Sequence, residues 1–149
     1  MAPVHAVASA LIDAPPATVY AILADYRDAH PQILPRQFFT GLEVEAGGQG
    51  AGTIFRTAVR VLGRETRFRM EVSEPQPGRV LSETDLATGL TTTFTVTPAA
   101  QGRQCEVEIA TVWEGSAGLA GLLERLTTPL IMRRIYQAQL ALLASYVKR

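Results

Sequence analysis

The chain has 149 residues and a mass of 16.1 kDa, and this length predicts one domain over residues 1–149 with a sizeable hydrophobic core. Hydrophobic residues make up 47% and charged residues 19%, which excludes intrinsic disorder. Lys plus Arg and Asp plus Glu number 14 each, which argues against a general nucleic-acid-binding protein, and the single cysteine excludes a disulfide framework or a cysteine-rich zinc site.

The N-terminal segment is apolar, but no Lys or Arg precedes the apolar run and the run ends at Asp13. Because a signal peptide needs a positive first region, we interpret Val4–Ile12 as a strand. Proline is favoured in the first turn of a helix, so Pro16–Ala24 is predicted as a short helix. A second helical segment is expected over Tyr26–Leu34, broken by Pro31. No run reaches the roughly 18 apolar residues of a membrane span, and we expect a cytoplasmic protein without stable membrane insertion.

From Phe38 to Trp113 the apolar residues recur at every second position, which predicts strands with one covered face and one wet face. Short turns between successive runs favour an antiparallel arrangement. A strand and not a helix follows the glycines of Gly47–Gly50, so this segment is predicted as a hairpin turn and not as a phosphate-binding loop. The predicted strands are Leu42–Glu45, Thr53–Val61, Arg67–Val72, Val80–Thr84, Leu90–Pro98 and Cys105–Trp113.

The last segment, Gly118–Lys148, is predicted as a long helix that covers the apolar face of the sheet. A straight helix cannot contact a twisted sheet everywhere, which predicts an apolar gap between them. The helix carries two apolar stripes about a quarter turn apart, and we expect a kink or break at Pro129 to explain this offset. The first stripe is Leu119, Leu122, Leu123 and Leu126, and the second is Met132, Tyr136, Leu140, Leu143 and Val147.

Three segments together resemble the START-like superfamily (SRPBCC, helix-grip), and within it the polyketide cyclase/dehydrase-like branch. They are IDAPPATVYAILADY (Ile12–Tyr26), GGQGAGT (Gly47–Thr53) and LLERLTTPLIMRRI (Leu122–Ile135). The resemblance implies an α+β fold, in which a seven-stranded curved antiparallel sheet grips a long C-terminal helix and two short helices lie between strands 1 and 2. It also implies an apolar cavity that binds a lipid, sterol, hormone or polyketide. A minority of members catalyse cyclisation, aromatisation or dehydration.

The candidate ligand-binding residues are the apolar side chains of the inner strand face and of the second stripe. For each of them taken alone, core packing is the more common role and the favoured interpretation, but for the set as a whole the resemblance favours a cavity. Trp113 is the strongest candidate, because a large ring with a polar N–H suits a partly open pocket. The set comprises Phe55, Val59, Phe68, Met70, Phe94, Ile109, Trp113, Met132, Tyr136 and Leu140.

Two residues are candidates for proton transfer. The resemblance implies that the segment with His30 forms one rim of the cavity mouth, where His30 could act as a general acid or base. A lone histidine before a proline is more often a helix cap or a surface residue, and we favour that interpretation. Glu83 shares a strand face with Asp85, and burial on an inner face would raise its pKa. The sequence leaves open which face of the strand is the inner one. Neither His5 nor His30 has a partner at ligand spacing, so we expect no metal and no cofactor.

Four arginines share one face of two adjacent strands. This face is either a docking site for an acidic partner or a solvated surface paired with nearby glutamates, and zero net charge favours the second. The arginines are Arg56, Arg60, Arg67 and Arg69. Overall, we expect a binder of a small hydrophobic molecule. The alternative is a cyclase/dehydrase-type enzyme acting on a polyketide-like or carbonyl substrate, and the sequence makes no prediction of oligomeric state.

Overall fold

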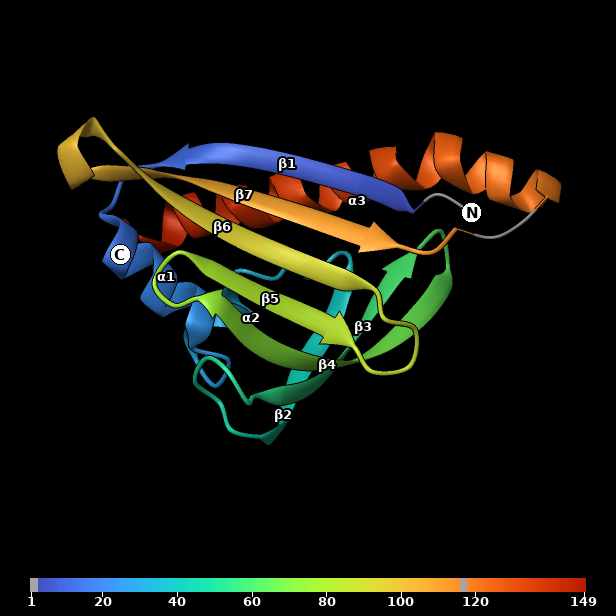
Figure 1. The fold of residues 1–149 in the computed structure, drawn as a ribbon, viewed down its shortest axis with the longest axis horizontal. Helices are drawn as coiled ribbons and strands as arrows, with labels where there is room; N and C mark the ends of the chain where they lie inside the picture. The colour runs from blue at the N-terminus through green and yellow to red at the C-terminus, as the bar shows by residue number, and fades with distance from the viewer. Residues whose placement is uncertain (1–2, 116–117) are drawn as a thin grey trace.

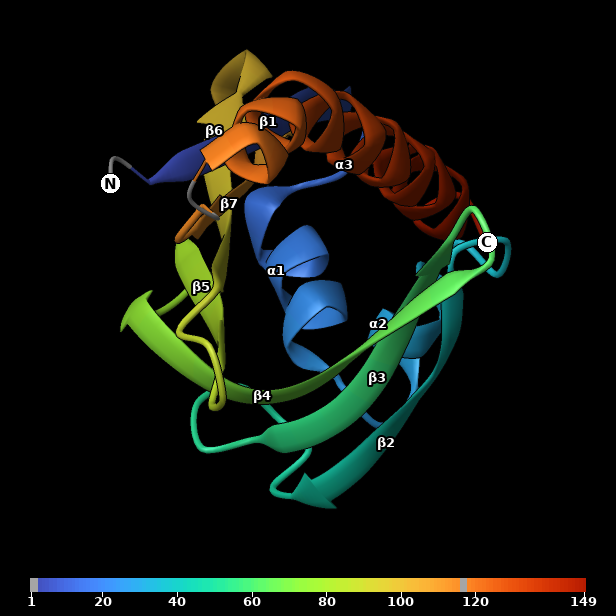
Figure 2. The same ribbon diagram turned by 90° about the vertical axis from the view of Figure 1, so that its right-hand side faces the viewer.

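The structure, a computed structural model, describes residues 3–115 and 118–149. One antiparallel sheet of seven strands is partly wrapped around helices α1 and α2 and is covered by helix α3 (Figures 1 and 2). The strand order in the sheet is β1-β7-β6-β5-β4-β3-β2. The elements are β1 (Val4–Ile12), α1 (Pro16–Ala24), α2 (Ala29–Gln32), β2 (Phe39–Ala46), β3 (Ile54–Val61), β4 (Arg64–Gln76), β5 (Val80–Asp85), β6 (Thr91–Ala99), β7 (Gln104–Trp113) and α3 (Gly118–Tyr146).

The predicted α+β helix-grip fold is confirmed. Consecutive strands from β2 to β7 pair with each other, and β1 pairs with β7, so only one connection leaves the simple up-and-down order. Figure 2 shows the sheet curved into an arc, with α3 lying across the open side of the arc and α1 within it, farther from the viewer. This curvature separates the middle of the sheet from α3, as the twist of antiparallel strands requires.

The segment after α1 differs from the prediction. Only Ala29–Gln32 is helical, where a helical segment over Tyr26–Leu34 was expected. Pro31 does not break this helix, because it lies within the first turn, where its missing N–H would have no intrahelical partner. The short helix α2 places His30 in the protein interior and not on the surface.

Helix α3 continues through Pro129, so the predicted break is absent. Its second half packs as predicted, since Tyr136, Leu140 and Leu143 are buried. The first stripe does not, because Leu122, Leu123 and Leu126 are exposed, while the side chain of Leu119 lies outside the described residues. Figure 1 gives the reason: the first half of α3 extends past the end of β1, so most of its length has no sheet beside it.

The inner face of β5 is also settled by the structure. Leu81, Glu83 and Asp85 are buried and share one face of the strand, so this is the inner face, and the sequence had left that choice open.

None of the helices within the described ranges is long and apolar enough to span a membrane.

Candidate functional site

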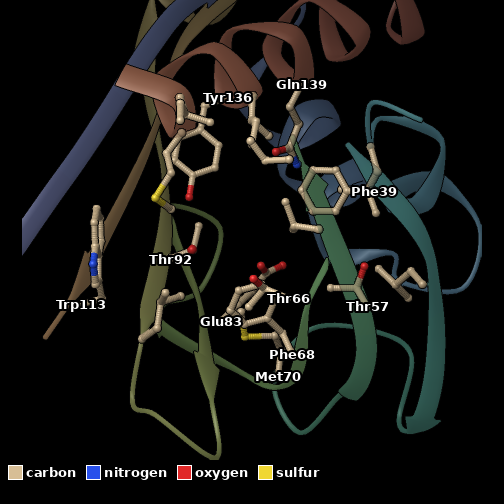
Figure 3. A pocket seen from close by; sticks show the side chains of 18 of the residues that line it. Phe39, Thr57, Thr66, Phe68, Met70, Glu83, Thr92, Trp113, Tyr136 and Gln139 are labelled. Atoms are coloured by element: carbon tan, nitrogen blue, oxygen red, sulfur yellow. The ribbon is translucent and has the colours of Figure 1, made fainter. Parts of the chain in front are cut away.

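A cavity of about 410 Å³ lies between the inner face of the curved sheet and α3 (Figure 3). Strands β3 to β6 form its floor and walls, and the second half of α3 forms its roof. Most of its surface is apolar, as the alternation of the strands predicts. The cavity is lined by these predicted residues: Phe55, Val59, Phe68, Met70, Phe94, Trp113, Met132 and Tyr136.

Two predicted residues lie elsewhere. Ile109 is buried beside its β6 partner Phe94, and Leu140 is buried on the face of α3 that packs against the core, so both belong to the hydrophobic core and not to the cavity wall. Trp113 lines the cavity as expected, but its indole N–H donates to Oε1 of Glu124, 3.2 Å away, and is therefore used within the protein. Contact of any of these residues with a ligand stays a prediction.

The cavity wall also contains residues that the sequence analysis did not select. Phe39 and Leu42 of β2 close one side of the cavity. Thr57 on β3 and Thr92 on β6 lie on the same strand faces as the selected aromatic residues. Their positions two residues from Phe55 and Phe94 were a usable signal, since residues two apart on a strand share a face. Gln139 lies three residues beyond Tyr136, and a helical wheel would have placed it on the same face of α3.

A buried polar cluster forms the deep end of the cavity. The Tyr26 hydroxyl donates to Oε2 of Glu83 at 2.6 Å, and Nε2 of His30 lies 3.6 Å from the same oxygen. Nδ1 of His30 lies 2.7 Å from the carbonyl oxygen of Leu23. Because a carbonyl only accepts, the proton of the neutral imidazole must be on Nδ1, and Nε2 faces Glu83 with its lone pair.

His30 is therefore not the cap or surface residue that we favoured from the sequence. It is 2% exposed, and its ring stacks on Tyr26 with a centroid distance of 4.5 Å while its edge contacts Phe94. It lines the cavity together with Glu83. The signal that misled the prediction was the neighbouring Pro31, which here is part of the helix α2 that holds His30 inside.

Burial controls the charge states of this cluster. Desolvation raises the pKa of Glu83 to about 7, against the opposing effect of the hydrogen bond from Tyr26, and lowers the pKa of His30 to about 4. At neutral pH the two side chains are therefore not an ion pair. A neutral imidazole faces a carboxyl group that is close to half-protonated, so Glu83 can hold and release a proton at the cavity surface.

Two neighbouring features keep Glu83 and Tyr26 in place. Asp85, on the same face of β5, accepts hydrogen bonds from the backbone N–H groups of Arg69 and Thr88, so it fixes the β5–β6 turn and lies outside the cavity lining. The turn after β2 reaches the end of α1, where the Tyr26 N–H donates to the Gly48 carbonyl at 2.9 Å. Gly48 has a φ of 135°, and an added Cβ would lie 2.3 Å from the Arg27 side chain, so the turn needs glycine here.

A second polar cluster lies where β6 and β7 meet α3. The Thr92 and Thr111 hydroxyls are 2.7 Å apart, and Thr111 is hydrogen-bonded to the Tyr136 hydroxyl. Burial raises the pKa of Tyr136, so this phenol is neutral at physiological pH. The cluster satisfies its own polar groups and joins the roof of the cavity to its wall.

The arginine face is a solvated surface, as predicted. Arg56 and Arg69 pair with Glu45, while Arg60 and Arg67 pair with Glu65. All four arginine side chains are largely exposed, so these pairs contribute little stability and leave no uncompensated positive patch. Among the residues that the structure describes, no cluster of three or more His, Cys, Asp or Glu side chains comes together at metal-binding distance.

Comparison with known proteins gives a consistent result. The family described as "Polyketide cyclase / dehydrase and lipid transport" matches residues 3–148. Among solved structures, the chain is similar to the KanY protein (ms6282), at 33% identity and a TM-score of 0.86 with 100% of each chain covered. It is also similar to the Zhui aromatase/cyclase from Streptomyces sp. R1128, at 18% identity and a TM-score of 0.80, covering 99% of this chain and 95% of that one.

A START superfamily protein from Mycobacterium smegmatis is a third structural match, at 16% identity and a TM-score of 0.73, with 97% of each chain covered. At these identities the aromatase/cyclase and the START protein show a shared fold alone. No curated protein matches the chain.

Proposed function

We propose that this chain, which belongs to the polyketide cyclase/dehydrase and lipid transport family, binds a small hydrophobic ligand of lipid-like or polyketide-like character in the cavity between the sheet and α3. The observation that carries the proposal is the cavity itself, about 410 Å³ of space lined mainly by apolar side chains. A space of this size and character is typical of small-molecule sites. A cytoplasmic location and a single domain over residues 1–149 stay predictions.

Burial of apolar surface supplies most of the binding free energy in this proposal. A ligand that buries roughly 200 Å² of apolar area would gain about 5 kcal/mol at about 25 cal/mol per Å². Phe55, Phe94 and Phe68 offer large apolar surfaces from three different strands, so the ligand is surrounded and not merely covered on one side.

The proposal is tested with the neutral fluorescent probe N-phenyl-1-naphthylamine and with native mass spectrometry of the freshly purified protein. We expect saturable probe binding and a co-purified hydrophobic mass. Val59→Phe places a ring into the cavity from β3 and is expected to weaken probe binding about tenfold by overpacking. The matched control is Val7→Phe on β1, because Val7 is exposed and lies outside the cavity lining.

Equal probe affinity in Val59→Phe and Val7→Phe would contradict binding inside the cavity. The absence of both probe binding and a co-purified mass in the wild-type protein would contradict the binding function itself.

A second candidate function is supported by the cluster of Tyr26, His30 and Glu83. In an enzyme of the cyclase/dehydrase type, protonated Glu83 would give its proton to a carbonyl or departing hydroxyl oxygen of the substrate. Tyr26 would stabilise the resulting carboxylate through its hydrogen bond to Oε2. A general acid contributes most when its pKa is close to the working pH, and the pKa of Glu83 is about 7.

This candidate predicts proton exchange at a carbon next to a carbonyl: protonated Glu83 gives its proton to the carbonyl oxygen, the unprotonated Nε2 of His30 accepts the proton of the neighbouring carbon, and the reverse step returns a solvent-derived proton to that carbon. In D2O, the wild-type protein is expected to accelerate deuterium incorporation into 1-tetralone, and Glu83→Gln is expected to lower that rate by roughly 100-fold or more while probe binding is retained. Nuclear magnetic resonance follows the exchange. An equal exchange rate in the wild type and in Glu83→Gln would rule out Glu83 as the acid.

A further inference from the structure

The second half of α3 presents an unpaired amide to the cavity. Gln139 is 3% exposed and lies among the cavity-lining residues. Figure 3 shows its amide pointing from α3 into the cavity, across from Glu83. Within residues 3–115 and 118–149, no side chain or backbone group forms a hydrogen bond with this amide. The amide is therefore buried from bulk solvent, but water or a ligand inside the cavity can contact it.

Gln139 lies among apolar neighbours on its helix, so its buried amide lowers the stability of the ligand-free protein compared with an apolar side chain. Ile135, Tyr136 and Leu143 lie three or four residues away on the same face and are buried. A leucine at position 139 would continue this apolar surface, whereas a buried amide loses free energy unless it finds a hydrogen-bond partner. Water in the cavity can supply that partner until a ligand replaces it.

The other buried polar groups of the cavity wall are in a different situation. Glu83 is bonded to Tyr26, and the hydroxyls of Thr92 and Tyr136 are bonded to Thr111. These groups have hydrogen-bond partners within the protein, and their hydrogen bonds stabilise the fold. Gln139 is not used in this way, and so its chemistry is available to a ligand.

We propose that Gln139 is a specificity-determining residue that binds a carbonyl or hydroxyl oxygen of the ligand, which makes the ligand an oxygenated apolar compound and not a plain hydrocarbon chain or ring. The inference rests on the proposed binding function and deepens it. An amide offers two N–H donors and an acceptor oxygen, so it can bind either a carbonyl or a hydroxyl. A ligand that places only carbon beside Gln139 removes its water without replacing the hydrogen bonds, and loses affinity.

The test uses two probes of nearly the same shape, 2-naphthol and 2-methylnaphthalene, with the full chain. The variants are Gln139→Leu and, as the matched control, Gln137→Leu, since Gln137 is exposed on the same helix. Titration gives the ratio of the two affinities, naphthol to methylnaphthalene. We expect Gln139→Leu to lower this ratio about fivefold or more, the effect of one hydrogen bond, and Gln137→Leu to leave it unchanged.

An unchanged ratio in Gln139→Leu, with both probes bound by the wild type, would overturn this inference and leave the binding function intact. Binding of neither probe by the wild type would overturn both. Thermal unfolding of the ligand-free protein separates a structural role: Gln139→Leu is expected to have a Tm equal to or above that of the wild type. A lower Tm would show that the amide stabilises the fold, and would also overturn the inference.

Discussion

Glu83 and His30 meet at the deep end of the cavity in a way that favours an uncharged pair. The Nδ1 proton of His30 is committed to the Leu23 carbonyl, so the lone pair on Nε2 faces Oε2 of Glu83. Burial raises the pKa of Glu83 to about 7, against the hydrogen bond from Tyr26, which lowers it. The fold thus keeps one exchangeable proton next to the ligand space near neutral pH.

Glu83→Gln is expected to change how the free energy of unfolding depends on pH. The pKa of Glu83 is about 7 in the folded protein and 4.5 ordinarily, so the folded state keeps a proton that the unfolded state loses between these values. The wild type therefore loses stability as the pH rises through this window. The variant lacks this loss, and its stability relative to the wild type should rise by about 3 kcal/mol between pH 4 and pH 8. Urea unfolding at both pH values measures the difference.

His30 titrates in the same pH range with the opposite sign, because its pKa is lowered to about 4 in the folded protein and stability is lost as it becomes protonated. Its lowered pKa is caused mainly by burial and not by Glu83, so its contribution is nearly the same in both proteins and changes the comparison little. Glu71→Gln, at an exposed position of β4, is the control. A stability difference between Glu83→Gln and wild type that stays the same at pH 4 and pH 8 would contradict the proton held at Glu83.

The sequence identified Glu83 and His30 as candidates but not as partners. Glu83 was selected because an inner strand face would desolvate it, and the structure confirms that face. His30 was judged from its neighbour Pro31, a local signal that carries no information about the strand to which the turn is anchored. Tyr26 and Glu83 lie 57 positions apart, and nothing in the pattern of either segment indicates their hydrogen bond.

Helix α3 is one continuous helix whose two halves have different surroundings. Its second half is held by the sheet through β1 and through the bond between Tyr136 and Thr111. Its first half carries leucines on an exposed face, and Leu126 is 62% exposed. The quarter-turn offset between the two stripes therefore reflects different surroundings and not a break at Pro129.

This difference predicts unequal costs for one substitution made at two positions of α3. Leu143→Ala removes a side chain that is 1% exposed and is expected to cost roughly 2–5 kcal/mol of unfolding free energy through the cavity it leaves. Leu126→Ala is expected to cost less than about 0.5 kcal/mol, as at other exposed positions. Chemical denaturation of the two variants measures both values, and similar costs would show that the first half of α3 is packed in solution.

At the scale of the whole molecule, the cavity exists because the sheet curves while the helix that covers it does not follow. Helix α3 contacts β1 at one edge, and the sheet then turns away from it through β5, β4 and β3 (Figure 2). The polar residues of the site come from elements spread along the chain, α2, β5, β6 and α3. A pocket assembled from such distant segments needs the complete fold before it can bind anything.

The amino-acid sequence by itself determined most of the elements and the inner faces of most strands, β5 excepted. Period, turn residues and caps act over a few positions, and they predict the bounds of β1 and α1, the antiparallel strands and eight of the residues that line the cavity. Only the tertiary structure decided that His30 faces Glu83, that Ile109 and Leu140 belong to the core, and that Gln139 opens into the cavity. These outcomes depend on how far the sheet curves and where α3 crosses it, and both are set by contacts between residues far apart in the chain.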